Sequence, residues 1–132
     1  MATPATDLRM NAVHYLRAPI AFSDLTGKVY TLGVVPAGSL VLRGGVCVTT
    51  VFNAASTNLL DIGTSADDDG FATDLALGTV GVIVVDEMAT SNDAYCASDT
   101  TIIATLAMSG TAATTGAGFV WVEYIPNPAL YA

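Results

Sequence analysis

The sequence has few charged residues for its length. Asp, Glu, Lys and Arg make up only 12% of its 132 residues, against a usual share of about 25%. A small domain that is alone in water needs charge on its surface, so we expect other protein chains to cover part of this one. The 4 Lys and Arg residues form no cluster. Nucleic-acid binding depends on such clusters, so no nucleic-acid partner is expected.

The few charges are unevenly placed along the chain. Residues 1–43 hold all four basic residues and two acidic ones, while residues 44–132 hold ten acidic residues and no Lys or Arg. Two interpretations are open. Either the N-terminal part meets an acidic surface, or the asymmetry is chance in a chain with so few charges.

Long apolar runs and cysteine motifs are also missing. No run approaches the about 20 apolar residues that a spanning helix needs, so no membrane partner is expected. The first residues show no basic stretch followed by an apolar one, which predicts no signal peptide and synthesis in the cytoplasm. Cys47 and Cys96 lack the spacing of a metal site. Two reduced thiols are expected, and a disulfide is the alternative.

Valine, threonine and glycine are plentiful, and their pattern predicts strands. Residues 34–63 organise the chain: a turn opens the stretch, a β-rich run covers residues 39–52, and residues 59–63 return after a polar loop. This pattern predicts a hairpin. Gly44 and Gly45 mark the expected place for a bulge or bend that moves the run from one sheet to another.

The rest of the chain predicts a β-sandwich. One or two helical turns are expected at residues 71–77, a break is expected at residues 18–19, and the buried type of strand at residues 80–86. The sequence predicts an all-β, single-domain β-sandwich of six to eight strands at residues 13–132, with an extended N-terminal arm at residues 1–12 and at most one short helix. The other expected strands cover residues 13–17, 28–35, 100–109 and 119–125.

The last expected strand is apolar on both of its faces. A sandwich strand with one wet face alternates apolar and polar residues. Either this strand is central and covered on both sides, or one face is an interface between subunits. We favour the interface, with Phe119, Trp121 and Tyr124 as its candidate residues.

Catalytic groups are sparse. Residues 59–64 are similar to the aspartic-protease pattern around Asp61, and a dimer of such half-sites can share one proton between two carboxylates. Ile62, however, occupies the position of the supporting hydroxyl. Asp61 is therefore better explained as an outward-facing strand residue. His14 is the only histidine, and no Ser/His/Asp or Cys/His set and no metal-ligand cluster is recognised in the sequence. The chain is predicted not to be an enzyme and to need no cofactor or small-molecule substrate.

The acidic stretch at residues 67–70 has the beginning of a calcium loop. Aligned with an EF-hand, it puts Ala76 where the bidentate Glu belongs, so that motif fails. A looser calcium site built from Asp61, Asp67 or Asp69 remains an alternative. A solvated acidic turn is the preferred interpretation, and no metal site is predicted.

Several turn and strand motifs together resemble one family. They are residues 35–40, 48–55 and 60–64, and the threonine- and glycine-rich loop at residues 110–118 that leads into residues 122–127. This order resembles the small virion proteins of tailed bacteriophages, in particular the head decoration, or cement, proteins. The resemblance covers residues 28–128.

The resemblance implies a jelly-roll-like subunit that forms a homotrimer on the outer capsid surface and stabilises the shell by bridging major capsid protein subunits. It implies no catalytic residues. Because the basic residues lie early in the chain, Arg9, His14 and Arg17 are the candidate capsid contacts. Alternatives are a head-fibre base, a tail or baseplate component, or a receptor- or carbohydrate-binding module that uses Trp121 or Tyr124 for stacking.

Overall fold

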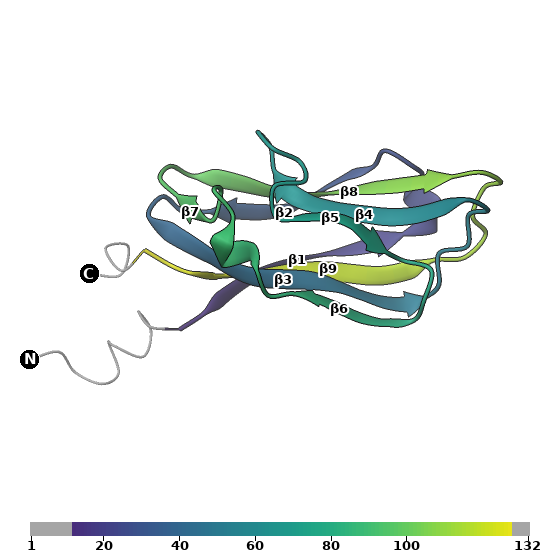
Figure 1. Ribbon diagram of the computed structural model, residues 1–132, viewed down its shortest axis with the longest axis horizontal. Coiled ribbons are helices and arrows are strands. Elements are labelled where there is room, and N and C mark those ends of the chain that lie inside the picture. Colours follow the sequence, from purple (N-terminus) through teal and green to yellow (C-terminus); the bar gives the residue numbers. More distant parts are fainter. Residues whose placement is uncertain (1–11, 128–132) are drawn as a thin grey trace, which may run out of the picture.

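The computed structural model describes residues 12–127, which fold into two facing antiparallel β-sheets (Figure 1). Sheet A has five strands in the order β1-β9-β3-β6, with β7 also beside β3, and sheet B has four in the order β2-β8-β4-β5. Residues 1–11 of the predicted arm lie outside the described residues. The elements are β1 His14–Ala21, η1 Phe22–Asp24, β2 Val29–Val35, β3 Ser39–Thr50, β4 Thr57–Thr64, β5 Ala72–Ala76, β6 Gly81–Val85, η2 Met88–Thr90, β7 Tyr95–Cys96, β8 Thr100–Ser109 and β9 Ala117–Ile125.

The strands pair in the order of a jelly roll. The first strand pairs with the last, β2 with β8, β3 with β6, and β4 with β5, all antiparallel. This is a long hairpin rolled up so that its strands alternate between two sheets. The predicted all-β sandwich with jelly-roll-like architecture is confirmed. Residues 12–127 hold nine strands rather than six to eight, because β5 replaces the helical turns expected at residues 71–77 and the two-residue strand β7 was not expected.

Alternating apolar residues build the core between the sheets. In β3 the inward residues include Val41, Val46 and Val48, and β9 contributes Val120 and Val122. Burying one valine side chain contributes about 1.5–3 kcal/mol relative to leaving it in water. Sheet B faces them with further fully buried residues: Leu60, Ile62, Ile102, Ala104 and Leu106.

The predicted hairpin at residues 34–63 is wrong. β3 belongs to sheet A and β4 to sheet B, so residues 51–56 cross between the sheets, with Phe52 buried at the crossing. Gly44 and Gly45 do not switch the strand between sheets either. The register of β3 against β9 shifts near Leu42 and near Thr49 instead. The crossing expected within this stretch does exist, but it lies after the strand, because the jelly-roll order places consecutive strands in opposite sheets.

Three other local predictions are wrong in whole or in part. The predicted helical turns at residues 71–77 form the edge strand β5, whose Leu75 pairs with Leu60 of β4. β1 also continues through the expected break at Pro19, because β1 is an edge strand and an edge tolerates proline. The strand predicted at residues 80–86 exists as β6, but Val82 and Val84 are exposed rather than buried. No helix in residues 12–127 is long and apolar enough to span a membrane.

Candidate interaction surface

The outward side of sheet A is a largely apolar surface with a shallow hollow of about 350 Å³. Because strand side chains alternate, the burial of Val120 and Val122 turns Phe119 and Trp121 outward. β1, β3 and β6 add their own outward residues beside them. We call this surface the aromatic face, and its lining residues are Tyr15, Arg17, Cys47, Val82, Phe119, Trp121 and Glu123.

Three side chains stack at the centre of the aromatic face. The guanidinium carbon of Arg17 lies 4.3 Å from the centroid of the Phe119 ring, and the rings of Phe119 and Trp121 are 6.2 Å apart and tilted by 54°. The register of the sheet explains this contact, since Arg17 pairs with Trp121 on β9 and Phe119 is two residues away on the same face. A cation over an exposed aromatic ring contributes about 0.5–1 kcal/mol.

Gly45 makes room for the Trp121 side chain. A Cβ atom at this position would lie 2.9 Å from Cη2 of Trp121 and would also collide with the carbonyl oxygen of Ile83 on β6. Gly45 pairs with Trp121 across the sheet. The glycine therefore lets the indole ring lie close to the sheet and lets β6 approach β3.

The aromatic face extends beyond the rings to exposed residues on both edge strands. Tyr15 on β1 is 64% exposed and Val82 on β6 is 61% exposed. A contiguous exposed apolar patch on a small protein marks an interaction site. Val84 on β6, also exposed, continues the patch.

One ion pair borders the aromatic face. Nε of Arg43 donates a hydrogen bond of 2.7 Å to Oε2 of Glu123. This hydrogen bond, the charge of Glu123 and, to a lesser extent, that of Asp86 raise the pKa of Arg43 above its usual value. The pair is exposed, so we regard it as a polar rim rather than a source of stability.

The structure merges two groups of residues that the sequence assigned to different partners. Arg17, a candidate capsid contact, lies on the same face as Phe119 and Trp121, the candidate subunit contacts. Tyr124 does not join them. It lies on the inner face of β9, is 7% exposed, and its ring centroid is 5.6 Å from that of His14.

Besides Tyr124, two more of the predicted site residues lie away from the aromatic face or outside the described residues. His14 contacts Tyr124, and Arg9 lies outside the described residues. Sequence reasoning missed Tyr15, Cys47 and Val82 as members of the face. The sequence shows only that apolar and polar residues alternate along each strand. It does not show which strands lie side by side, so these three residues could not be grouped from the sequence.

The candidate protease residue has a structural partner. Oδ1 of Asp61 accepts a hydrogen bond of 2.7 Å from the backbone N–H of Asp74. Asp74 has a left-handed backbone (φ 56°) at an irregularity of β5. Asp61 is thus a strand residue of sheet B that ties down this irregular turn of the neighbouring strand.

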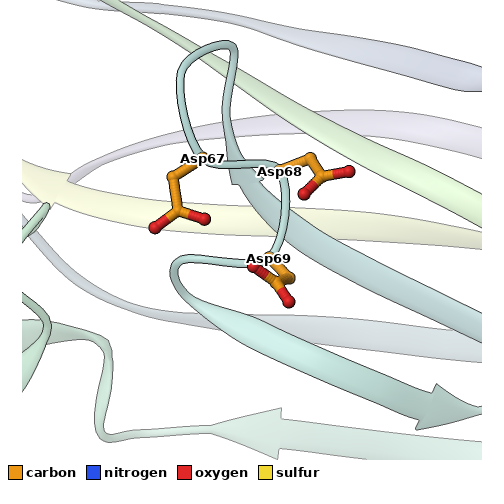
Figure 2. Close-up of side chains that lie close together, drawn as sticks. All are labelled: Asp67, Asp68 and Asp69. Atoms are coloured by element: carbon orange, nitrogen blue, oxygen red, sulfur yellow. The ribbon is translucent and has the colours of Figure 1, made fainter.

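The three consecutive aspartates form an acidic loop between β4 and β5 (Figure 2). The carboxylates of Asp67, Asp68 and Asp69 offer oxygen atoms within 4.8 Å of one another, and all three residues are exposed. The backbone of the loop is held by a hydrogen bond of 2.8 Å from the Thr64 N–H to the Asp67 carbonyl. Such a group can hold a cation, but exposed acidic groups are common without one.

A polar hollow of about 440 Å³ lies beside this loop, where Asp67, Glu87 and Asp93 supply carboxylates. Its hydrogen bonds serve the fold: the Ser91 hydroxyl donates to the carbonyl of Gly70, and the Asp93 N–H donates to the Ser91 hydroxyl. A Cβ atom at Gly70 would meet the Asp93 carboxylate, so that side chain would have to move.

The two cysteines are free thiols in different surroundings. Cys47 is partly exposed on the aromatic face, and Cys96 is buried. Burial raises the pKa of the Cys96 thiol above its usual value. A raised pKa and low exposure make Cys96 the less reactive of the two.

Comparison with known proteins identifies similar structures but no similar sequences. No protein-family model matches the chain, and no curated protein matches it. Solved structures do match. A chain in the acid-stable capsid structure of Helicobacter pylori bacteriophage KHP30 superposes with a TM-score of 0.61 at 19% identity, covering 87% of this chain and 88% of that one.

Two further matches come from other phage capsids. A chain in the capsid asymmetric unit of cyanophage Pam1 gives a TM-score of 0.63 at 18% identity, covering 86% of this chain and 84% of that one. A chain in the capsid of Ralstonia phage GP4 gives 0.62 at 16% identity, with 87% and 84% covered. At these identities the likeness shows a shared fold. Because coverage is high in both directions, the matched chains are also similar to this one in length.

Proposed function

We propose that this protein is a structural component of a tailed-phage virion, and specifically a decoration protein that binds the outer surface of the capsid as a homotrimer and stabilises the shell. One observation carries the proposal: three phage capsid structures each contain a chain with this fold and about this length. The low charge of the sequence and its exposed aromatic face support it, since both are expected of a subunit that is covered by other chains.

The aromatic face is the surface we assign to the contact with the major capsid protein. It combines partly buried rings, an arginine and a polar rim, which is the composition of the centre of many protein interfaces. Trp, Tyr and Arg are the residue types that most often dominate binding energy. Trp121, Tyr15 and Arg17 are therefore the expected anchors, in place of the separate capsid and subunit contacts that the sequence predicted.

The contribution of such a protein to the virion is mechanical. A decoration subunit that contacts neighbouring capsid subunits adds binding free energy only to the assembled shell, so the shell becomes harder to open. No covalent chemistry is required. The residues that matter are those that fill the interface, and the core of the sandwich serves to hold them in place.

The proposal is tested with capsids assembled from the major capsid protein of the same genome, with and without this chain. The purified protein should co-sediment with these capsids, and cryo-electron microscopy should place it on the outer surface in groups of three. Decorated capsids should also release their DNA at a higher temperature than undecorated ones. If the protein does not bind capsids, or is located in the tail, the decoration function is wrong.

A further inference from the structure

The edges of the two sheets differ in how they are protected. Both edge strands of sheet B contain an irregularity: β2 has an extra residue at Leu32, and β5 has one near Asp74. Bulges of this kind twist an edge and stop a further strand from pairing with it. Both edges of sheet B are therefore closed to addition of another strand.

The β6 edge of sheet A has no such protection. Its five residues pair one to one with β3, from Gly81 opposite Val48 to Val85 opposite Gly44, with no shift in register. The strand holds no charged residue and no proline. Within residues 12–127, β3 is the only strand with which it pairs. A regular, uncharged edge strand is a template for a strand of another chain.

The opposite edge of sheet A is open over a matching length. β1 pairs with β9 in regular register, and Pro19, which has no N–H, interrupts its second half. The residues before Pro19, from His14 to Ala18, are five in number, as many as in β6. Sheet A thus has two edges of equal length that no other strand within residues 12–127 covers.

We propose that copies of this chain associate by pairing the β6 edge of one copy with the β1 edge of the next, so that sheet A continues from subunit to subunit. This inference rests on the homotrimer of the proposed function and gives it an interface. Neighbouring strands of sheet A are all antiparallel, so β1 and β6 run in opposite directions. A rotation about an axis along the strands brings them together as an antiparallel pair, and such head-to-tail contacts close into a ring of three where the rotation between copies is one third of a turn.

The charges at the two edges are complementary. β6 is followed by the exposed residues Asp86 and Glu87, and β1 carries the exposed Arg17. The Arg43–Glu123 pair is the only salt bridge among the described residues, so none of these three charges is used in an ion pair within that part of the subunit. The acidic end of β6 lies at the same end of sheet A as the start of β1, as their registers with β3 and β9 show.

This charge pattern favours pairing with β1 over pairing of two β6 strands. Each copy has a net charge of −8, so association needs a local attraction to offset the repulsion. The contact of β6 with β1 brings Arg17 of one copy near the acids of the next. A two-fold pairing of β6 strands brings no basic residue near them.

The first experiment measures the mass of the full-length protein in solution by light scattering. Val84→Lys puts a charge on the β6 edge, and Val34→Lys puts the same charge on the protected β2 edge at a valine of equal exposure, 54% against 51%. The wild type and Val34→Lys should be oligomers, and Val84→Lys should fall to the mass of one chain, 13.5 kDa. Thermal unfolding verifies that both variants fold.

Two results of this experiment overturn the proposal. One is a Val84→Lys variant that keeps the wild-type mass. The other is a wild type that is monomeric at every concentration tested.

The second experiment identifies the partner strand by cross-linking in a Cys47→Ala background. Arg17→Cys combined with Val84→Cys should give disulfide-linked dimers and closed rings on oxidation, and neither single variant should do so. Tyr15→Cys combined with Val84→Cys tests the register shifted by two residues, which keeps the same face outward. Dimers from Val84→Cys alone would show pairing of two β6 strands and overturn the proposal. Absence of cross-links in both double variants would also overturn it.

Capsid binding separates this inference from the proposed function. If the wild type binds capsids while Val84→Lys keeps the wild-type mass, the edge contact is wrong and the decoration function stands. If the masses and cross-links come out as expected but the wild type does not bind capsids, the edge contact stands and the decoration function is wrong.

Discussion

The outer faces of the two sheets are covered to very different degrees by the chain itself. On sheet B the acidic loop folds back over Gly63, where a Cβ atom would collide with the carbonyl oxygen of Asp67. The rest of this face mixes threonine, such as Thr31, with the exposed valines Val29 and Val34 of β2. On sheet A the described residues leave Phe119, Trp121 and Tyr15 without such a cover. One fold therefore presents one face that its own acidic loop partly covers and one aromatic face that the described residues leave uncovered.

This difference shows which features of the sequence are structural and which are available for binding. The ten acidic residues after residue 43 include the three of the loop over sheet B, and they keep that side of the molecule hydrated. The aromatic face has two of the three basic residues among residues 12–127, Arg17 and Arg43. The following changes test whether the two faces have the different roles that their compositions indicate.

The largest expected effect is on capsid binding by Trp121→Ala. Removing a central interface tryptophan costs about 2–4 kcal/mol, so binding should weaken by at least about 30-fold. Ile103→Ala on the outer face of sheet B is the matched control and should leave binding unchanged. Sedimentation with capsids over a range of protein concentrations measures both. Equal losses for the two variants would remove the distinction between the faces.

The next effect is on stability and concerns the close approach of β6 to β3. Gly45→Ala pushes a methyl group into the carbonyl of Ile83 and should lower the free energy of unfolding by about 1–3 kcal/mol. Gly63→Ala on sheet B should cost less, because the exposed loop above it can move. Gly78→Ala, which meets nothing within 4 Å, is the neutral control. Urea unfolding measures all three, and a larger loss for Gly63→Ala would reverse the expected order.

A third effect concerns the contact between the sheets at Tyr30. Its hydroxyl donates a hydrogen bond of 2.8 Å to Asp24, and burial together with this hydrogen bond raises the pKa of Tyr30 well above its usual value. Tyr30→Phe should lower the free energy of unfolding by about 1 kcal/mol at neutral pH.

The same residue predicts a pH dependence at alkaline pH. Above the unfolded tyrosine pKa of about 10, the unfolded chain releases the proton and the folded chain keeps it, so this contribution to stability is lost as the pH rises. Chemical unfolding at several pH values between neutral and alkaline measures the loss. The free energy of unfolding of Tyr30→Phe should fall less steeply with rising pH than that of the wild type. Equal slopes would show that Tyr30 is not the group responsible.

The smallest effect is expected in the acidic loop. Asp68→Asn removes one exposed charge and should change the free energy of unfolding by no more than about 0.5 kcal/mol. Capsid binding should also stay the same, because the loop lies on sheet B. Thermal unfolding with and without calcium is the measurement. A melting temperature that rises with calcium in the wild type and not in Asp68→Asn would instead make the loop a cation site.

The sequence predicted the fold class because strands of valine and threonine between glycine- and proline-rich turns have few alternative structures. It did not predict which strands pair. Residues 39–52 and 59–63 looked like a hairpin because they are adjacent in the chain, yet the jelly roll separates them into two sheets. Residues 71–77 have apolar residues spaced as in a short helix, but pairing with β4 makes them a strand.

The sequence predicted only part of the candidate site, again because it did not show how the strands pack together. The apolar residues on both sides of β9 indicated an interface, and Phe119 and Trp121 do lie on an outward face. Tyr124 lies on the opposite side of β9 and belongs to the core. Because both sides of this strand are apolar, the sequence did not show which side faces the core. The sequence did not show that β6 is an edge strand, because a run of valines is equally consistent with a buried strand and with an exposed edge strand.

The order of strands in sheet A also has a consequence for how the protein is made. β9 is the last of the described strands in the sequence and lies between β1 and β3, so the two strands made first in this sheet have no connection until β9 has been synthesised. Pairings between such distant segments form slowly. During translation β3 can pair with β6 before β9 is made, whereas β1 must wait unpaired for β9. A chain that ends before β9 therefore lacks the strand that joins β1 to the rest of sheet A.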